Sequence, residues 1–272
     1  MMPRVHFSIV RYLPLLICTL APGCTSPQSV AAQKWKDQFA KGEALFKEKC
    51  SSVAGMKIYR TVENVDGLLL LKVRGTPGER EWRDPMWPSA AFENEYGGET
   101  YIKSFLSQEH APGNADGTPG AITPQYRGYL NTARRPTGRP GYLFVDVIDE
   151  RDGTRYRYKG RWEEPWQYDK SYLKGYIKFF LDKAVAPEPA PRYAVTYEEY
   201  VVPEERALWV AGGKVSVIDL AKNEVLGEMI QYKHSWGGIS PWLRGPICPG
   251  FGGTSDGYTR KFVDQVLIPV GR

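Results

Sequence analysis

The spacing of apolar residues predicts a helix near each end of the folded part of the chain. In residues 35–50, apolar side chains recur at intervals of three to four residues or their sums, with Lys and Glu between them. Gly42 weakens this helix, because glycine loses more backbone freedom on folding than other residues. Residues 259–267 repeat the helical spacing, and the pattern stops at Pro269. The apolar residues are Trp35, Phe39, Leu45 and Phe46 in the first segment and Phe262, Val263, Val266 and Leu267 in the second.

Between these two segments the period changes to that of strands. Residues 57–62 alternate, Asp66-Gly67 is a turn signal, and residues 68–73 form a short apolar run. Together they predict a hairpin or a bent strand pair.

A second hairpin is predicted around Asp152-Gly153, which separates residues 142–148 from residues 154–159. Its outgoing strand alternates Tyr with basic residues. Residues 172–181 have an ambiguous period and are compatible with either a helix or a strand.

The last third of the chain has the clearest pattern. Its β-compatible segments are separated by turn signals at Gly212-Gly213 and Lys222-Asn223, which predicts a β-meander. The segments are residues 193–202, 208–211, 214–219 and 224–232.

Segments without a period separate these elements. Residues 76–94 predict a long loop, and residues 100–106 a short helix. Residues 111–140 are rich in Pro and Gly and are expected to be irregular, and residues 234–253 predict a Gly- and Trp-rich loop. A stiff Pro-rich connector, residues 186–191, is the candidate internal boundary.

The predicted fold class is therefore α+β, with an antiparallel β-meander and hairpins, an N-terminal and a C-terminal helix, and many loops. The chain has 272 residues, of which 42% are hydrophobic and 25% are charged, so that most of it should fold as a soluble globule. We expect a single domain over residues 35–272. The net charge of +5 is too mild to indicate a nucleic-acid partner or a specifically acidic one.

The N-terminus has the layout of an export signal. Arg4 and Arg11 supply a positive flank, and residues 12–20 form an apolar stretch too short for a stable membrane span. Pro14 and the pair Pro22-Gly23 argue against a buried core helix.

Two cleavage sites stay open. Residues 20–24 are similar to a bacterial lipoprotein signal, in which the cysteine, here Cys24, receives lipid; Leu20 lies four residues before Cys24, one more than usual. Residues 1–23 would then be a signal peptide and residues 24–34 a tether, in a membrane-anchored protein that faces the periplasm. The alternative is cleavage after Ala32 by ordinary signal peptidase, which would give a soluble periplasmic protein.

The cysteines agree with export. Cys18 lies in the signal, and if Cys24 is lipidated, Cys50 and Cys248 remain as a pair, which most simply forms a disulfide. The alternatives are free thiols, a catalytic thiol or a metal ligand. A catalytic thiol needs a nearby His, and the mature chain offers His110 and His234. A zinc site is not expected, because the chain contains neither CxxC nor HxxxH.

The search for chemistry favours a protein without catalytic activity, cofactor or metal. The chain has no GxxxxGK[ST] phosphate loop and no HExxH metal motif. His234 and Ser235 are adjacent, which argues against a dyad, and we expect His234 to anchor a loop instead. Neighbouring carboxylates, a possible glycoside-hydrolase pair, are more often simply solvated. They are Glu163-Glu164, Glu198-Glu199 and Glu204-Glu205.

Tryptophan in Pro- and Gly-rich loops is the most informative chemistry in the chain. Such residues form sugar-stacking platforms or anchors of protein interfaces, and the alternative is that they cover the core of the sheet. The candidate partner-binding residues are Trp82, Trp87, Trp162, Trp166, Trp236 and Trp242.

With its signal, its region after Cys50 (VAGMKIYRTVENVDGLLLL), the segment WVAGGKVSVIDLAKNEVLGE and the terminal CPGFGG and FVDQVLIP, the chain resembles uncharacterised envelope lipoproteins of Gram-negative bacteria. Its architecture is also similar to that of periplasmic immunity lipoproteins, which neutralise lipase toxins delivered between bacteria. These resemblances imply a lipid-anchored, non-enzymatic envelope protein that binds a protein partner, such as a toxin. The alternatives are an envelope hydrolase or a glycan-binding or glycan-active protein that uses Trp platforms with Glu and Asp, and a structural envelope component.

Overall fold

The computed structural model describes residues 27–106, 110–111, 125–128, 133–134, 140–237, 241–250 and 257–270. The chain divides into two units, residues 1–37 and residues 38–272. Helix α1 (Pro27–Ser52) contains the helix predicted over residues 35–50, and from Gln38 onward it belongs to the second unit. The contacts described below all lie in the second unit.

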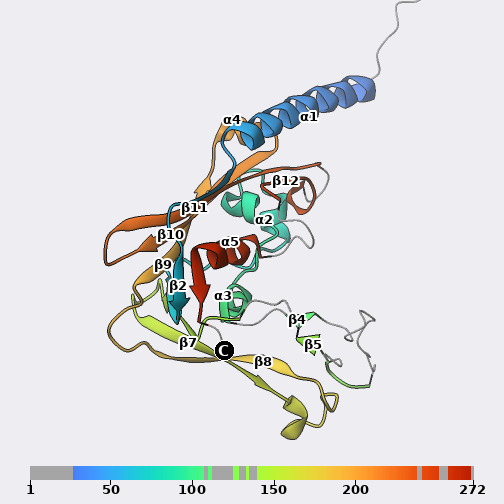
Figure 1. Ribbon diagram of the computed structural model, residues 1–272. Helices are drawn as coiled ribbons and strands as arrows, with labels where there is room; N and C mark the ends of the chain where they lie inside the picture. Colours follow the sequence, from blue (N-terminus) through green and yellow to red (C-terminus); the bar gives the residue numbers. More distant parts are fainter. Residues whose placement is uncertain are drawn as a thin grey trace, which may run out of the picture. The chain divides into compact units, whose positions relative to one another are not determined.

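The second unit is built on a mixed, mostly antiparallel sheet (Figure 1). Its strands are β1 (Gly55–Ile58), β3 (Gly67–Leu70), β6 (Phe144–Ile148), β7 (Arg155–Glu163), β8 (Lys178–Val185), β9 (Tyr193–Tyr200), β10 (Val210–Asp219), β11 (Glu224–His234) and β12 (Ile247–Cys248). They are ordered β1-β11-β10-β9-β3-β6-β7-β8, with β12 beside β11. Together with the helices packed on the sheet, this is the α+β class that the sequence predicts.

The centre of the sheet is β3, which lies parallel to both of its neighbours, β6 and β9. Leu68, Leu69 and Leu70 are all buried, as a continuous apolar run in a central strand requires. The hairpin predicted over residues 57–73 is wrong, because Gly67 does not reverse the chain. A Cβ at Gly67 would lie 2.5 Å from the Phe144 ring, so this glycine allows close strand packing instead.

The other strands of that segment pair with distant partners. Strand β1 pairs with β11, and β2 (Val62–Val65) pairs in parallel with β13 (Leu267–Pro269). The predicted hairpin around Asp152-Gly153 is confirmed, since β6 and β7 are antiparallel. The ambiguous residues 172–181 end in a strand, β8.

The predicted meander is confirmed in β9, β10 and β11, but the turn at Gly212-Gly213 is wrong. Both residues lie inside β10, and they are glycines because aromatic rings occupy the space that a side chain would take. A Cβ at Gly212 would lie 2.7 Å from the Tyr232 ring, and one at Gly213 would meet Phe92. Gly212 thus makes room for a ring of the neighbouring strand β11, and Gly213 for a ring of the helix η1.

Helices cover one face of the sheet. The predicted helices over residues 259–267 and 100–106 are present as α5 (Tyr258–Val266) and α3 (Glu99–Leu106), and both are apolar where they meet the core. Residues 76–94, predicted as a loop, contain α2 (Glu79–Arg83) and the 3-10 helix η1 (Pro88–Phe92). Pro88 starts η1, and the buried run after it packs on β10 and β11.

The remaining elements are short. They are α4 (Pro203–Ala207), η2 (Pro165–Gln167), η3 (Pro241–Leu243), β4 (His110–Ala111) and β5 (Ala133–Arg134). The Pro-rich residues 186–191 join β8 to β9 inside the second unit. Within the described residues, no helix is both long enough and apolar enough to cross a membrane.

The C-terminal half of α1 covers the opposite face of the sheet at β10 and β11. Phe46 packs with Val210 and Tyr232 in a second apolar cluster. A Cβ at Gly42 would lie 2.7 Å from Nε2 of His234 and would also collide with the backbone oxygen of Leu208. The glycine that weakens the predicted helix is therefore what allows the helix to lie this close.

The predicted disulfide between Cys50 and Cys248 is confirmed. It ties the end of α1 to β12, with the two Cα atoms 5.7 Å apart. Because the cysteines are 198 residues apart, the bond closes a loop of most of the second unit.

Carboxylates buried in the sheet are paired with cations. Asp219 binds both Arg60 and Arg192, which hold the pKa of its carboxyl at about 2. Asp146 binds Arg155 and Arg157 at 2.5 and 2.7 Å. These pairs satisfy charges that would otherwise be costly to bury.

Candidate functional site

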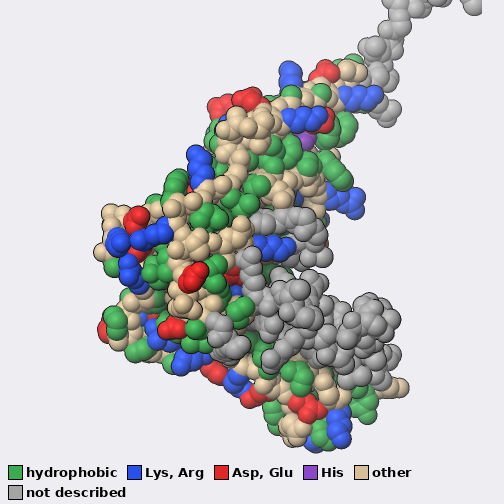
Figure 2. All heavy atoms as spheres, viewed as in Figure 1, with side chains coloured by type: hydrophobic (Ala, Val, Ile, Leu, Met, Phe, Trp, Pro, Cys, Tyr) green, Lys and Arg blue, Asp and Glu red, His purple; other side chains and the backbone are tan. Residues whose placement is uncertain are grey.

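The described part of the chain concentrates aromatic and basic side chains in one hairpin, residues 155–185, which we call the aromatic–basic hairpin. It holds nine of the 35 aromatic residues of the chain, and eight Lys or Arg against four Asp or Glu. Its net charge of +4 compares with +5 for the whole chain. Figure 2 shows Lys and Arg side chains interspersed with apolar ones along this part of the surface. This one contiguous segment thus carries a net charge nearly as large as that of the whole chain.

The register of β7 and β8 sorts the side chains onto two faces. Tyr156, Tyr158 and Trp162 alternate with basic residues along β7, so the aromatic side chains share one face. Trp162 lies opposite Phe179, with ring centroids 4.8 Å apart. Gly160 makes this possible, because any Cβ there would collide with the Phe179 ring.

The tip of the aromatic–basic hairpin, residues 164–177, is built from stacks of cations on aromatic rings. The Nζ atoms of Lys170 and Lys174 lie 3.5 and 4.9 Å from the centre of the Trp166 ring. Lys170 also donates a hydrogen bond of 2.8 Å to the carbonyl of Trp166. Each such stack contributes about 0.5–1 kcal/mol at an exposed site.

A second stack lies beside the first and uses a residue from another segment. Arg127 lies 4.3 Å from the centre of the Tyr172 ring, and Lys178 lies 5.8 Å from it. Tyr176 is stacked on Tyr172 at 6.0 Å with nearly parallel rings. The main chains are joined as well, since Leu173 N donates to Arg127 O at 2.9 Å.

Two carboxylates fix the backbone of the tip. Glu164 accepts hydrogen bonds from Gly175 N and from Gln167 Nε2, each at 2.5 Å. The bond from Gly175 is the main reason that the pKa of Glu164 is lowered from its usual value. Asp169 accepts from Ser171 N at 3.0 Å, and this bond lowers the pKa of Asp169 in the same way. These bonds brace the backbone of the tip at both ends of residues 164–175 and at residues 169–171 between them.

Cations of the aromatic–basic hairpin differ in how far they are neutralised. At its base, Arg155 and Arg157 share the buried Asp146, and Arg161 pairs with Asp182 at 3.0 Å. Four lysines have no carboxylate within 4 Å in the part of the chain that the structure describes. They are Lys159, Lys170, Lys174 and Lys178. Their charge is left to act on solvent or on a partner.

The six tryptophans predicted to bind a partner do not share one surface. Trp162 and Trp166 lie in the aromatic–basic hairpin. Trp87 and Trp242 are buried in the core, where Trp242 donates from Nε1 to Asp84 O at 2.8 Å and so ties η3 to the end of α2. These two cover the core of the sheet, which is the alternative that the sequence left open.

The other two tryptophans lie near η3 and α2. Trp82 is partly buried against the core, whereas Trp236 is 57% exposed. Trp236 N donates to Arg244 O, which places this residue beside η3. Two further exposed apolar residues are Leu243, at the end of η3, and Met86, between α2 and η1.

Other candidate residues have structural partners. His234 is buried, with its ring 5.0 Å from Phe39 and 6.0 Å from Phe46, and burial lowers the pKa of His234. Its backbone N–H, rather than its side chain, bonds the following loop through Pro246 O. The hydroxyl of Ser235 donates to Pro241 O, so it does not donate to His234 as a catalytic dyad would require.

The predicted carboxylate pairs are bound by neighbours rather than facing one another. Glu198 pairs with Lys214 at 3.1 Å, and Glu205 with Lys49 at 2.7 Å. Glu199 accepts from Ser89, and Glu163 pairs with Arg161. No group of three or more His, Cys, Asp and Glu among the described residues could hold a metal ion.

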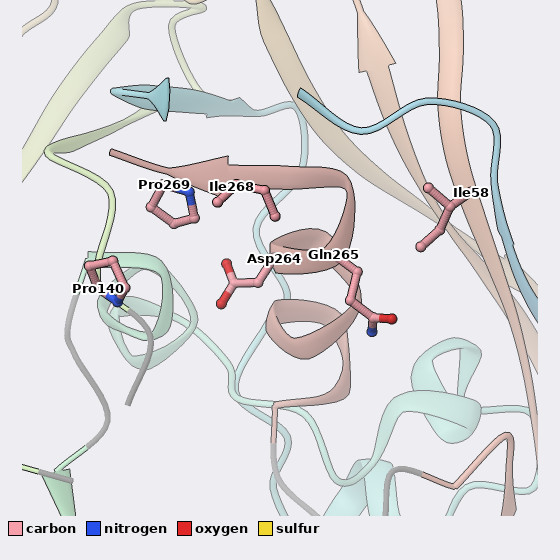
Figure 3. A pocket seen from close by; sticks show the side chains of 6 residues that line it. All are labelled: Ile58, Pro140, Asp264, Gln265, Ile268 and Pro269. Carbon is pink, nitrogen blue, oxygen red and sulfur yellow. The ribbon is translucent and has the colours of Figure 1, made fainter. Parts of the chain in front are cut away.

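A hollow of about 480 Å³ lies between α5, β13 and the edge strand β1 (Figure 3). In the figure, Ile58 and Pro140 lie on opposite sides of it. Asp264 is bound by Arg260 at 2.6 Å, and Gln265 donates to Lys261 O, so their polar atoms are engaged. The hollow presents mainly apolar side chains, from Ile58, Pro140, Ile268 and Pro269.

No protein-family model, curated protein or solved structure matches this chain.

Sequence reasoning missed the lysines and Tyr172 as parts of the site. Trp166, Lys170, Lys174 and Lys178 recur every four residues, a signal that could have singled them out. The expectation that the chain has no GxSxG nucleophile motif is wrong, because residues 253–257 read GTSDG and match the G-x-S-x-G spacing of a serine nucleophile. Ser255, like Cys24 and the His110 side chain, lies outside the described residues.

Proposed function

We propose that this chain is an exported, lipid-anchored, non-enzymatic protein of the cell envelope that binds a protein partner through the aromatic–basic hairpin. The observation that carries the proposal is the tip, where rings and unneutralised lysines are fixed together by Glu164 and Asp169. Aromatic residues that lose little entropy on binding are the usual anchors of protein interfaces. The resemblance to immunity lipoproteins makes a toxin the partner class to test first.

The anchor is tested on the N-terminus of the purified natural protein. The expected mature chain begins at Cys24 and carries lipid, and a Cys24→Ser variant is released from membranes in soluble form. Mass spectrometry that found a chain beginning at Gln33 would replace the anchored protein with the soluble periplasmic alternative. An intact Met1 would refute export itself.

Partner binding is tested by photo-crosslinking in cell-envelope fractions. A crosslinking amino acid replaces Tyr168, which is 63% exposed on the tip, or Tyr59, which is 57% exposed at the other end of the sheet. We expect a discrete crosslinked protein from position 168 and none from position 59. No product, or the same product from both positions, would refute the hairpin as the contact surface.

An envelope hydrolase is the second candidate, and it is favoured by the GTSDG segment directly before α5, which begins at Tyr258. A nucleophile elbow places its serine at the turn into a helix. The test is hydrolysis of p-nitrophenyl esters by the wild type and a Ser255→Ala variant, with Thr254→Ala as the control. Activity that Ser255→Ala abolishes and the control keeps would support a hydrolase over a binding protein.

A further inference from the structure

The outer edge of β8 carries main-chain groups whose direction follows from one hydrogen bond. Ala186 N donates to Arg155 O at 2.8 Å, and the register places Tyr156 opposite Val185. In an antiparallel pair, the main-chain N–H and C=O groups of one residue bond to the paired strand, and those of the next residue point away from it. The N–H and C=O groups that point away from β7 therefore belong to Phe179, Leu181, Lys183 and Val185.

Strand β8 is the longer of the two edge strands of the sheet. Strand β8 has eight residues and, among the described residues, pairs with β7 alone, whereas the opposite edge strand β1 has four. Its run Lys178–Val185 contains neither Pro nor Gly, which are common means of blocking an edge. An added strand could thus make a continuous ladder with it.

The side chains along this edge select for negative charge. Lys178 lies over the rings of Tyr172 and Phe180. Lys183 lies 3.8 Å from the centre of the Tyr156 ring and 4.0 Å from Asp149, which Arg151 binds more closely, at 2.6 Å. The single acid of the strand, Asp182, already binds Arg161. Two copies of this edge would bring like charges together, since each aromatic–basic hairpin carries +4. A second copy of the chain is therefore a poor occupant.

We propose that β8 binds its partner by strand addition, and that the partner contributes an extended, acidic segment. This rests on the proposed protein-binding function and specifies its geometry. Main-chain hydrogen bonds to the four outward residues would give affinity, and the lysines beside them would select carboxylates over amines.

Amide exchange measured by NMR on the purified protein tests the geometry without the natural partner. The probe is a blocked octapeptide of alternating Glu and Val, and the control is the same peptide with Lys in place of Glu. We expect the Glu peptide to slow exchange of the outward amides of residues 179, 181, 183 and 185 by about tenfold, and the Lys peptide to leave them unchanged. Protection by both peptides, or by neither, would overturn the proposal.

Proline at an outward position sharpens the test, because it removes one free N–H and leaves the β7 ladder intact. Lys183→Pro should lower the affinity for the Glu peptide about tenfold, whereas Lys183→Ala, which keeps the N–H, should lower it about threefold. If Lys183→Pro does not fold, Val185→Pro at the end of the strand serves instead. Equal binding by the Pro and Ala variants would refute strand addition.

The crosslink at position 168 separates this proposal from the function on which it rests. A crosslinked partner that persists at full yield in Lys183→Pro would leave protein binding standing and overturn strand addition. Binding to vesicles of phosphatidylglycerol with unprotected β8 amides, or concentration-dependent self-association blocked by Lys183→Pro, would overturn the acidic partner in favour of a membrane or a second copy.

Discussion

The two ends of the sheet keep water from their side chains in different ways. At β10 and β11, another element does so, since α1 lays Phe46 on Val210 and Tyr232 and a disulfide fixes its end. At β7 and β8, side chains of the strands themselves cover the rings, since Lys183 lies over Tyr156 and Arg161 over Phe180. The first arrangement buries apolar area, and the second leaves charge at the surface.

This difference indicates where the stability of the molecule lies. Burying one side chain such as Phe46 fully contributes about 1.5–3 kcal/mol. A cation on an exposed ring contributes about 0.5–1 kcal/mol. We therefore expect the α1 end to dominate the free energy of unfolding and the aromatic–basic hairpin to tolerate substitution.

The largest expected effect comes from removing the disulfide. A Cys50→Ala/Cys248→Ala double variant should lose about 2–5 kcal/mol of unfolding free energy in urea, because the bond restricts a long loop in the unfolded chain. Amide exchange should accelerate more in α1 and β12 than in β7 and β8, because edge strands exchange largely through local openings that the disulfide does not oppose. Equal acceleration at both ends of the sheet would contradict the comparison.

A smaller loss is expected from Gly42→Ala. Alanine favours a helix by about 1 kcal/mol, but its Cβ would collide with Leu208 O and with His234, so that the net effect is a loss of about 1–3 kcal/mol. Lys41→Ala, at the exposed neighbouring position, is the control and should be neutral or slightly stabilising. If both variants are stabilised alike in thermal unfolding, α1 does not lie this close to β11.

Gly42, which weakens the helix by its local propensity and yet allows it to pack closely, shows what a sequence can and cannot predict. Period and composition identify elements that depend on local pattern, such as α5, the β6–β7 hairpin and the meander. They misread Gly67 and the pair at Gly212, because a glycine that ends a strand and one that admits a ring from a neighbour have the same letter. What distinguishes them is the ring that packs against each glycine, from Phe144, Tyr232 or Phe92, and the local pattern does not contain it.

The site was predictable to a similar extent. The position of Trp162 and Trp166 in the aromatic–basic hairpin was predictable, because the alternation of Tyr with basic residues indicates strand β7. Trp87 and Trp242 look the same in sequence, yet they are core residues, since their loops fold back over the sheet. The cation stacks depend on Arg127 approaching Tyr172 from another segment, which no local pattern contains.

The α1 end should also respond to pH through His234. Burial lowers the pKa of His234 from 6.5, and Glu43 opposes this in part. The unfolded chain therefore takes up a proton at higher pH than the folded one. The resulting stability is complete above pH 6.5 and is lost as the pH falls through the folded pKa.

Urea unfolding from about pH 7 to about pH 5 tests this on the wild type and on His234→Phe. The wild type should lose more unfolding free energy than the variant over this range. Parallel curves would mean that His234 takes up protons equally well in the folded state.

The smallest stability effect is expected at the other end. Trp166→Ala should cost about 1 kcal/mol or less, because the ring is only partly buried and its stacks with Lys170 and Lys174 are exposed to water. The same variant should lose the crosslink at position 168. A loss of several kcal/mol would make the aromatic–basic hairpin a structural element rather than a binding surface.

Strand β3 has a consequence for how the chain is made. Its four residues are the contact between the two ends of the sheet, and its partners, β6 and β9, begin 77 and 126 residues after Gly67. During synthesis, Leu68, Leu69 and Leu70 therefore lack a hydrogen-bonded neighbour on one side until residues near 195 have emerged. That interval is the time when a chaperone is most needed.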